Sequence, residues 1–374
     1  MHVVEPLGHA DAMRGLWRAA AVERLSHAML VRGPRGVGKF TACVWLAQGL
    51  LCRDLAAAAQ DPQWSPCGAC PSCKKVNSGE WRGNHPDLLR VDPVEETWEE
   101  IPIQAVAERS GDSGGVCVGS FLKLRPAEGD HRVVLVREAE RMNLPAQNAL
   151  LKTLEEPSAG TFLLLESSRP DSLLPTIRSR VLEVRLGALS DADTEAVLAE
   201  RVAEDESLAE VDLVGLAALA RGAPGEVLRL ARTGALGLLG AVTPLLEGRG
   251  DALVAASSVW DVEGEHPGGT ALARDRGRAR LVLELLRDVL AGALRVGATA
   301  DPAQAGRGEP ARLAELLSSR HGRAALTAGL EGLLRVRRDI DLNLDPGAAL
   351  ERALVGLEAE LALAAGATGV GPRG

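Results

Sequence analysis

The stretch GPRGVGK has the spacing of a phosphate-binding loop, G-x-x-x-x-G-K, between an apolar run and a helical pattern. Gly33, Gly36 and Gly38 would let backbone N–H groups approach phosphate oxygens, helped by the positive end of the following helix. Lys39 would lie over the outer phosphates. In loops that hydrolyse nucleotides the next residue is Ser or Thr, whose hydroxyl binds Mg²⁺, but here it is Phe40. The sequence therefore predicts a phosphate cradle without its metal ligand.

A second metal contact is missing from the run VVLVRE. In nucleotide-hydrolysing enzymes with this loop, the neighbouring strand ends in an Asp that helps to hold Mg²⁺. Here that position is Arg137, followed by Glu138, and an arginine repels a metal ion. Arg137 can also be interpreted as a surface charge at a strand end. Phe40 and Arg137 together favour a chain that does not hydrolyse nucleotide at its own site. Thr41 does not replace the missing hydroxyl, because it is one residue further along and rotated by about 100° around the helix.

Two interpretations of the loop stay open. In the first, the loop binds ATP, ADP or another anion without turnover, and Arg137 supplies part of the missing metal charge. In the second, Phe40 packs into the vacated space and the loop is vestigial.

Four of the six cysteines have the spacing of a metal site: Cys52, Cys67, Cys70 and Cys73. Two overlapping C-x-x-C turns and one upstream cysteine supply four thiolates, the donor set of a closed structural Zn²⁺ site, so we expect a zinc module over about 52–73. An iron–sulfur cluster also takes four cysteines, and a Cys₃His set that uses His85 is a further alternative. The fourteen-residue spacer after the first cysteine has no role that the sequence explains.

The elements that position these groups change in character along the chain. Up to about residue 187, short β-branched runs alternate with helical patterns, which predicts an α/β domain with a parallel sheet. HAMLVRG is the expected strand before the loop, and TACVWLAQGLLC is the expected helix after it. From about Leu189, nearly every segment has helical periodicity, which predicts all-α structure to the end.

Composition narrows the class of protein. The 374 residues suit two or three domains, and a hydrophobic content of 46% suffices for their cores, although aromatic residues make up only 2%. A net charge of −9 argues against a free-standing nucleic-acid binder, which usually has a basic surface. The N-terminal residues lack the pattern of a signal peptide and no apolar run is long enough to span a bilayer, so we expect a cytoplasmic protein without membrane contact.

The motifs occur in the order found in bacterial clamp-loader subunits of DNA polymerase III, which are AAA+ proteins, and the chain resembles that family over roughly residues 5–230. The resemblance is carried by the loop with its flanking elements, the four cysteines, NHPDLLRVDP, ERMNLPAQNALLKTLEEP, LLPTIRSRV and RGAPGEVL. It implies three domains: a degenerate AAA+ P-loop domain at 1–187 that carries the zinc insertion, a small helical lid at 188–236 and a helical collar for oligomerisation at 237–374.

Three departures from the family's ATPase pattern are similar to its delta-prime branch. The ATPase subunits have Thr or Ser after the loop lysine, Asp-Glu at the strand end and an arginine in the lid. This chain has Phe40, Arg137 and Gly225 at those places. The resemblance therefore implies a non-hydrolysing subunit of the sliding-clamp loader.

The chain keeps TIRSRV, which is similar to the family's Ser-Arg-Cys motif, whose arginine reaches across a subunit boundary. The resemblance implies that Ser179 and Arg180 act in trans on a partner subunit, with Arg180 as an arginine finger. From spacing alone, the nearby Arg178 is also a candidate, and Arg180 can be interpreted as an arginine paired with a carboxylate.

The partners implied are the gamma/tau ATPase subunits and the delta subunit, with the sliding clamp and primer-template DNA engaged through the assembly. One alternative is a catalytically active gamma/tau-type ATPase with unusual metal ligands, such as Thr41 and Glu138. Another is a zinc-containing AAA+ scaffold without a catalytic role.

Overall fold

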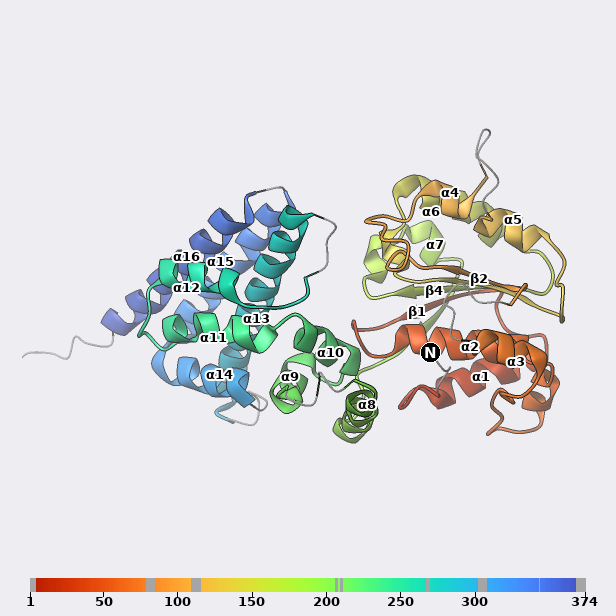
Figure 1. Ribbon diagram of the computed structural model, residues 1–374, viewed down its shortest axis with the longest axis horizontal. Coiled ribbons are helices and arrows are strands. Elements are labelled where there is room, and N and C mark those ends of the chain that lie inside the picture. The colour runs from red at the N-terminus through yellow and green to blue at the C-terminus, as the bar shows by residue number, and fades with distance from the viewer. Residues whose placement is uncertain are drawn as a thin grey trace, which may run out of the picture. The chain divides into compact units, whose positions relative to one another are not determined.

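The computed structural model of the chain has two compact units, Met1–Asp193 and Thr194–Gly374 (Figure 1). The structure describes residues 5–78, 85–108, 116–205, 208, 211–266, 270–301, 308–342 and 344–367. Among these residues, every strand lies in the first unit and the second unit is helical.

A five-stranded parallel sheet forms the centre of the first unit, in the order β2-β3-β4-β1-β5. Its strands are β1 (Ala28–Arg32), β2 (Leu88–Val91), β3 (Arg132–Val136), β4 (Thr161–Ser167) and β5 (Leu182–Arg185). The central strands are almost entirely buried and rich in Leu and Val, because both faces of the sheet are covered. Leu30 lies opposite Leu165, so β1 and β4 end at the same edge. The predicted α/β class is confirmed.

Helices cover both faces of this sheet (Figure 1). The bounds are α1 (Ala10–Ala21), α2 (Lys39–Leu51), α3 (Pro71–Val76), α4 (Ile103–Val106), α5 (Val118–Lys123), α6 (Leu144–Glu155) and α7 (Pro175–Arg178), with 3₁₀ turns η1 (Leu55–Ala59), η2 (Ala139–Arg141) and η3 (Pro170–Ser172). On one face α2 packs against β1, β3 and β4, with α1 and α3 packed on α2. On the other face lie α4 to α7. This arrangement fixes α2, and the loop before it, against the centre of the sheet.

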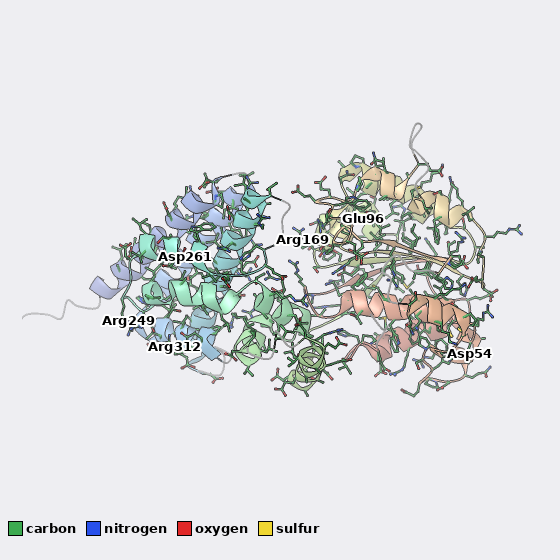
Figure 2. The ribbon with its side chains drawn as sticks, viewed as in Figure 1. Asp54, Glu96, Arg169, Arg249, Asp261 and Arg312 are labelled. Carbon is green, nitrogen blue, oxygen red and sulfur yellow. The ribbon has the colours of Figure 1, made fainter. Side chains whose placement is uncertain are left out.

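Three tryptophans join α1 and α2 to the spacer, residues 53–66. Trp17 of α1 is fully buried and lies edge-on to Trp45 of α2, with ring centroids 4.4 Å apart. Trp64 of the spacer lies edge-on to the same Trp17 at 5.2 Å, and its indole N–H donates to Asp54 over 3.5 Å (Figure 2). Aromatic pairs of this kind stabilise a core beyond the area they bury. The long spacer therefore has a structural role that the sequence did not indicate.

The contact between α1 and α2 depends on Gly49. A Cβ atom at Gly49 would lie 2.1 Å from Nε1 of Trp17, which donates to the carbonyl oxygen of Leu46 over 3.0 Å. Gly49→Ala is expected to lower the free energy of unfolding by about 1–3 kcal/mol, as overpacking does. Gly15→Ala is the matched control, because a Cβ atom there meets nothing within 4 Å, and helix propensity should stabilise it by about 0.5–1 kcal/mol. Urea unfolding of the full chain measures both, and equal effects would contradict this account.

The second unit consists of helices packed around one hydrophobic core. Their bounds are α8 (Asp191–Glu204), which begins at the end of the first unit, α9 (Leu213–Ala220), α10 (Pro224–Arg232), α11 (Ala235–Leu246), α12 (Ala252–Ser258), η5 (Val259–Asp261), α13 (Ala271–Thr299), α14 (Gly308–Arg320), α15 (Arg323–Asp341) and α16 (Pro346–Ala367). The core extends from Leu198 of α8 to Leu361 of α16. The all-α character of this region is confirmed, whereas the predicted division into a lid at 188–236 and a collar at 237–374 stays a prediction.

Ion pairs connect two helices of the second unit. Glu247, after α11, pairs with both Arg249 and Arg312, which joins the end of α11 to α14 (Figure 2).

No helix within the described ranges combines the length and the apolar character needed to cross a membrane.

Candidate functional site

The phosphate loop connects β1 to α2, as predicted. Gly33 leaves no room for a side chain, because a Cβ atom there would lie 2.2 Å from the carbonyl oxygen of Leu186. Gly36 and Gly38 have φ angles of 80° and 89°, in the region that favours glycine. Gly38 directly precedes Lys39, the first residue of α2. The predicted cradle residues are therefore brought together at the end of β1.

Lys39 is buried and has three polar partners. Its ammonium group donates to the carbonyl oxygen of Pro34 over 2.9 Å and to Oγ of Ser168 over 2.8 Å. The third partner is Oε1 of Glu166, at 3.0 Å, in an ion pair whose two side chains are only 3% and 6% exposed. Lys39 thus makes two hydrogen bonds and one buried ion pair within the chain itself.

The two residues that replace metal ligands contact each other. The guanidinium carbon of Arg137 lies 4.6 Å from the ring centroid of Phe40, within the range of a cation–π contact. The same guanidinium group donates to Oδ2 of Asp92 over 3.0 Å, and Asp92 is buried. A positive charge with its own carboxylate thus lies beside Phe40. Asp92 was not predicted, since it is distant in the sequence and reaches Arg137 only because β2 pairs with β3.

Glu166 is a further residue that sequence reasoning missed. It lies near the end of β4 and accepts a hydrogen bond from the backbone N–H of Glu138 over 2.9 Å, in addition to its ion pair with Lys39. Glu138 has a φ of 46°, which is unusual for a residue with a side chain. The signal in the sequence was a carboxylate within the otherwise apolar run TFLLLESS, because a buried charge requires a partner.

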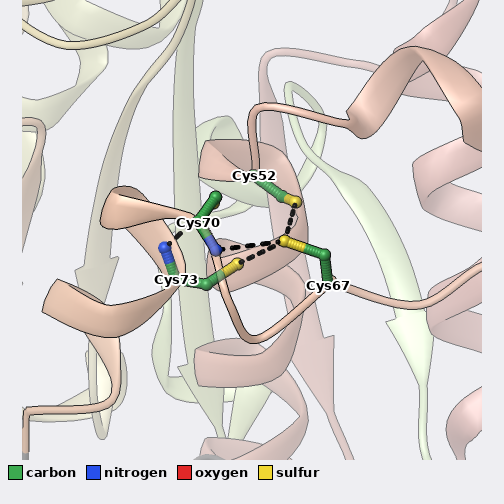
Figure 3. Close-up of side chains that lie close together, drawn as sticks. All are labelled: Cys52, Cys67, Cys70 and Cys73. Carbon is green, nitrogen blue, oxygen red and sulfur yellow. Dashed lines mark hydrogen bonds between the residues drawn. The ribbon is translucent and has the colours of Figure 1, made fainter.

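The four cysteines converge on one point, as Figure 3 shows. Their sulfur atoms all lie within 4.8 Å of one another, with 3.7 Å between Cys52 and Cys67 and 4.0 Å between Cys67 and Cys73. Four sulfurs that each lie about 2.3 Å from a tetrahedral Zn²⁺ are about 3.8 Å apart. The backbone N–H of Cys70 donates to the sulfur of Cys67 over 3.4 Å, which helps to fix the first turn. The donor set fits a closed zinc site.

The thiols of the cluster shift one another's pKa values. The hydrogen bond from Cys73 lowers the pKa of the Cys52 thiol to about 5, and the same contact raises the pKa of Cys73. One thiolate is thus stabilised by its neighbours. Both ring nitrogens of His85 have partners outside the cysteine cluster: Nε2 lies 2.7 Å from Oγ of Ser72, and Nδ1 accepts from the backbone N–H of Asp87 over 3.0 Å. The metal-binding group therefore consists of the four cysteines, without His85. His85 connects the cysteine module to the unit's core.

Arg180 and Ser179 follow α7 and are exposed. The guanidinium group of Arg180 donates to the carbonyl oxygen of Thr176 over 3.0 Å and pairs with Glu155 at 2.9 Å. Ser179 donates to the same carbonyl over 3.1 Å. Arg178, the other candidate from spacing, pairs with Asp171 at 2.7 Å. Ser179 and Arg180 therefore share one carbonyl acceptor in α7. Lys39 has none of these partners, because it contacts Pro34, Ser168 and Glu166.

The parallel sheet, its phosphate loop and the helical region that follows define an AAA+-type P-loop protein with a candidate four-cysteine metal centre. Residues 8–190 match the family described as DNA polymerase III, delta subunit. The predicted resemblance is confirmed over this region, where the chain is similar to clamp-loader subunits of DNA polymerase III, among them relatives named delta prime.

Three relatives illustrate the similarity. DNA polymerase III subunit delta' of Pseudomonas aeruginosa (strain PAO1) is 39% identical over 158 residues, 42% of this chain and 42% of its own length. The delta' subunit of Bacillus subtilis (strain 168) is 34% identical over 168 residues, 45% of this chain and 44% of its own. DNA polymerase III subunit tau of Escherichia coli (strain K12) is 30% identical over 221 residues, 59% of this chain and 30% of its own. The chain therefore spans less than half the length of each of these relatives.

Proposed function

We propose that the chain is a non-hydrolysing subunit of a sliding-clamp loader and that it completes the ATPase site of a neighbouring subunit with Arg180. The observation that carries this proposal is the contact between Arg137 and Phe40. The two positions that hold Mg²⁺ in P-loop hydrolases are taken here by side chains that contact each other. Without these two ligands, the loop lacks the metal ion that offsets the charge developing on a transferring phosphoryl group in P-loop hydrolases.

Arg180 supplies the catalytic contribution in trans. Its exposure allows an approaching subunit to reach the guanidinium group, and Ser179 fixes the preceding turn through Thr176. An arginine that enters a neighbour's site adds positive charge where negative charge develops in the transition state. The ion pair with Glu155 is half exposed, so exchanging this carboxylate for a phosphoryl group costs little.

The proposed cofactor is a structural Zn²⁺ bound by Cys52, Cys67, Cys70 and Cys73. Four thiolates close the coordination shell and leave no position for a reacting water, so the metal supplies stability rather than catalysis. The proposed partners are the gamma/tau ATPase subunits and the delta subunit, with the sliding clamp and primer-template DNA engaged through the assembly. The proposed location is the cytoplasm.

The main alternative is an active gamma/tau-type ATPase, which the similarity to the Escherichia coli tau subunit supports in part. It requires Thr41 and Glu138 to bind Mg²⁺. Glu138 instead pairs with Arg141 at 2.9 Å, and Arg137 would lie beside the metal ion. A zinc-containing AAA+ scaffold without a catalytic role is the remaining alternative.

A clamp loader reconstituted with this chain tests the proposal. Steady-state ATP turnover is compared between the wild type, Lys39→Ala and Arg180→Ala, and the isolated chain is assayed alone. Loss of turnover with Arg180→Ala but not with Lys39→Ala supports the proposal. The reverse pattern supports the ATPase alternative, and no change with either supports the scaffold.

A further inference from the structure

The phosphate loop already holds an anion that belongs to the chain itself. The Glu166 carboxylate contacts the Lys39 ammonium group at 3.0 Å, at the atom that would bind the outer phosphates of a nucleotide. We propose that Glu166 is an internal counter-ion that replaces the terminal phosphate and closes the loop to ATP, ADP and inorganic phosphate. This goes beyond the proposed function, because Arg180 can act on a neighbour whether or not this loop binds a ligand.

The Lys39 ammonium group is already in contact with three oxygen atoms of the chain. Pro34 and Ser168 accept from it over 2.9 Å and 2.8 Å, and Glu166 is the third partner. A phosphate that approaches Lys39 would therefore compete with these three groups. Displacement of Glu166 would leave a carboxylate, buried at 5% exposure, without its cation.

Glu166 is also fixed from its other side. Its Oε2 accepts a hydrogen bond from the backbone N–H of Glu138 over 2.9 Å. That N–H points at the carboxylate from a residue with a φ of 46°, a conformation that a non-glycine residue adopts only when its surroundings impose it. The strand ends of β3 and β4 therefore cooperate in holding the carboxylate at Lys39.

Electrostatics oppose binding beside Glu166 as well. Two like charges about 4 Å apart, at an effective dielectric constant of about 20, weaken binding by roughly 10³-fold. In P-loop hydrolases, Mg²⁺ neutralises part of the phosphate charge. Arg137, which occupies the position of a metal ligand here, is already paired with Asp92 at 3.0 Å, so its charge is offset within the chain. The outer phosphates of a nucleotide would therefore lie beside the Glu166 carboxylate, with no metal ion to offset the repulsion.

Equilibrium dialysis and calorimetry of the full chain with ATP, ADP and inorganic phosphate test this inference. The wild type is expected to bind none of them at millimolar concentration. Glu166→Ala removes the carboxylate and is expected to bind ATP at least tenfold more tightly than the wild type, and Glu166→Gln, which keeps the shape without the charge, should gain less. If Glu166→Ala does not fold, as judged by circular dichroism, Glu166→Gln decides the question.

Two controls assign the gain to Lys39. Adding Lys39→Ala to Glu166→Ala should abolish the acquired binding. Glu140→Gln changes a nearby carboxylate that accepts from the backbone N–H of Ser168 over 3.1 Å, and it should bind no better than the wild type. The inference is overturned if the wild type binds ATP below millimolar concentration, or if neither Glu166 variant gains affinity. The finger proposal fails by a different result, unchanged turnover of the loader with Arg180→Ala.

Discussion

Replacing Arg180 with alanine is expected to lower ATP turnover at the neighbouring site of a reconstituted clamp loader by roughly 10³-fold or more, the range of arginine fingers in other phosphoryl-transfer enzymes. The effect follows from charge, because the guanidinium group stabilises the transferring phosphoryl more strongly in the transition state than in the ground state. The loss is therefore expected in kcat rather than in KM. Single-turnover measurements on the assembled loader test this at the affected site.

The stability of the chain itself should hardly change in this variant. Arg180 is 38% exposed and its partner Glu155 is 52% exposed, so their ion pair contributes at most about 1 kcal/mol. Arg178→Ala, two residues earlier, is the matched control, since it removes a similar exposed pair with Asp171. Glu155→Gln should also leave turnover intact. Equal losses from Arg178→Ala and Arg180→Ala would point to a disturbed α7 instead of a finger.

The sequence predicted the groups whose positions are set locally. The cradle glycines and Lys39 are consecutive, so their strand–loop–helix context was enough to place them. Three of the four cysteines lie within seven residues, and the turns between them predicted the cluster. Cys52 lies beside these three cysteines because α2, which places it there, ends directly before it.

The contacts that the sequence did not reveal depend on the order of the strands in the sheet. Glu166 reaches Lys39 because β4 lies beside β1, although many residues separate them in the chain. Asp92 reaches Arg137 because β2 pairs with β3. Periodicity predicts that such strands exist, but it does not say which are neighbours. The charges that the sequence predicted at the loop therefore lacked the two carboxylates that pair with Lys39 and Arg137.

Removing the proposed zinc ion is expected to have the largest effect on stability. Apparent zinc-binding free energies of structural sites in zinc-finger peptides are roughly 10–16 kcal/mol, and binding of this kind is coupled to folding. Cys73→Ser replaces a fully buried ligand and is expected to abolish stoichiometric zinc and lower the Tm by about 10 °C or more, since 1 kcal/mol shifts the Tm by roughly 2–4 °C in a unit of this size. Metal analysis and thermal unfolding of the purified chain measure both quantities.

The same change should reach the tryptophans, because the spacer that carries Trp64 ends at the cysteine cluster. Trp64 lies 5.2 Å from Trp17, so chelation is expected to alter tryptophan fluorescence along with the loss of zinc. Cys117→Ser is the matched control: this buried cysteine caps α5 by accepting from the N–H of Ser120, and serine is a favoured residue at that position. One equivalent of zinc still bound to Cys73→Ser would exclude a structural zinc site at these cysteines. A wild-type chain that is purified without zinc and melts at the same temperature with and without a chelator would exclude it as well. Iron in place of zinc would instead support the cluster alternative, because both metals accept four thiolates.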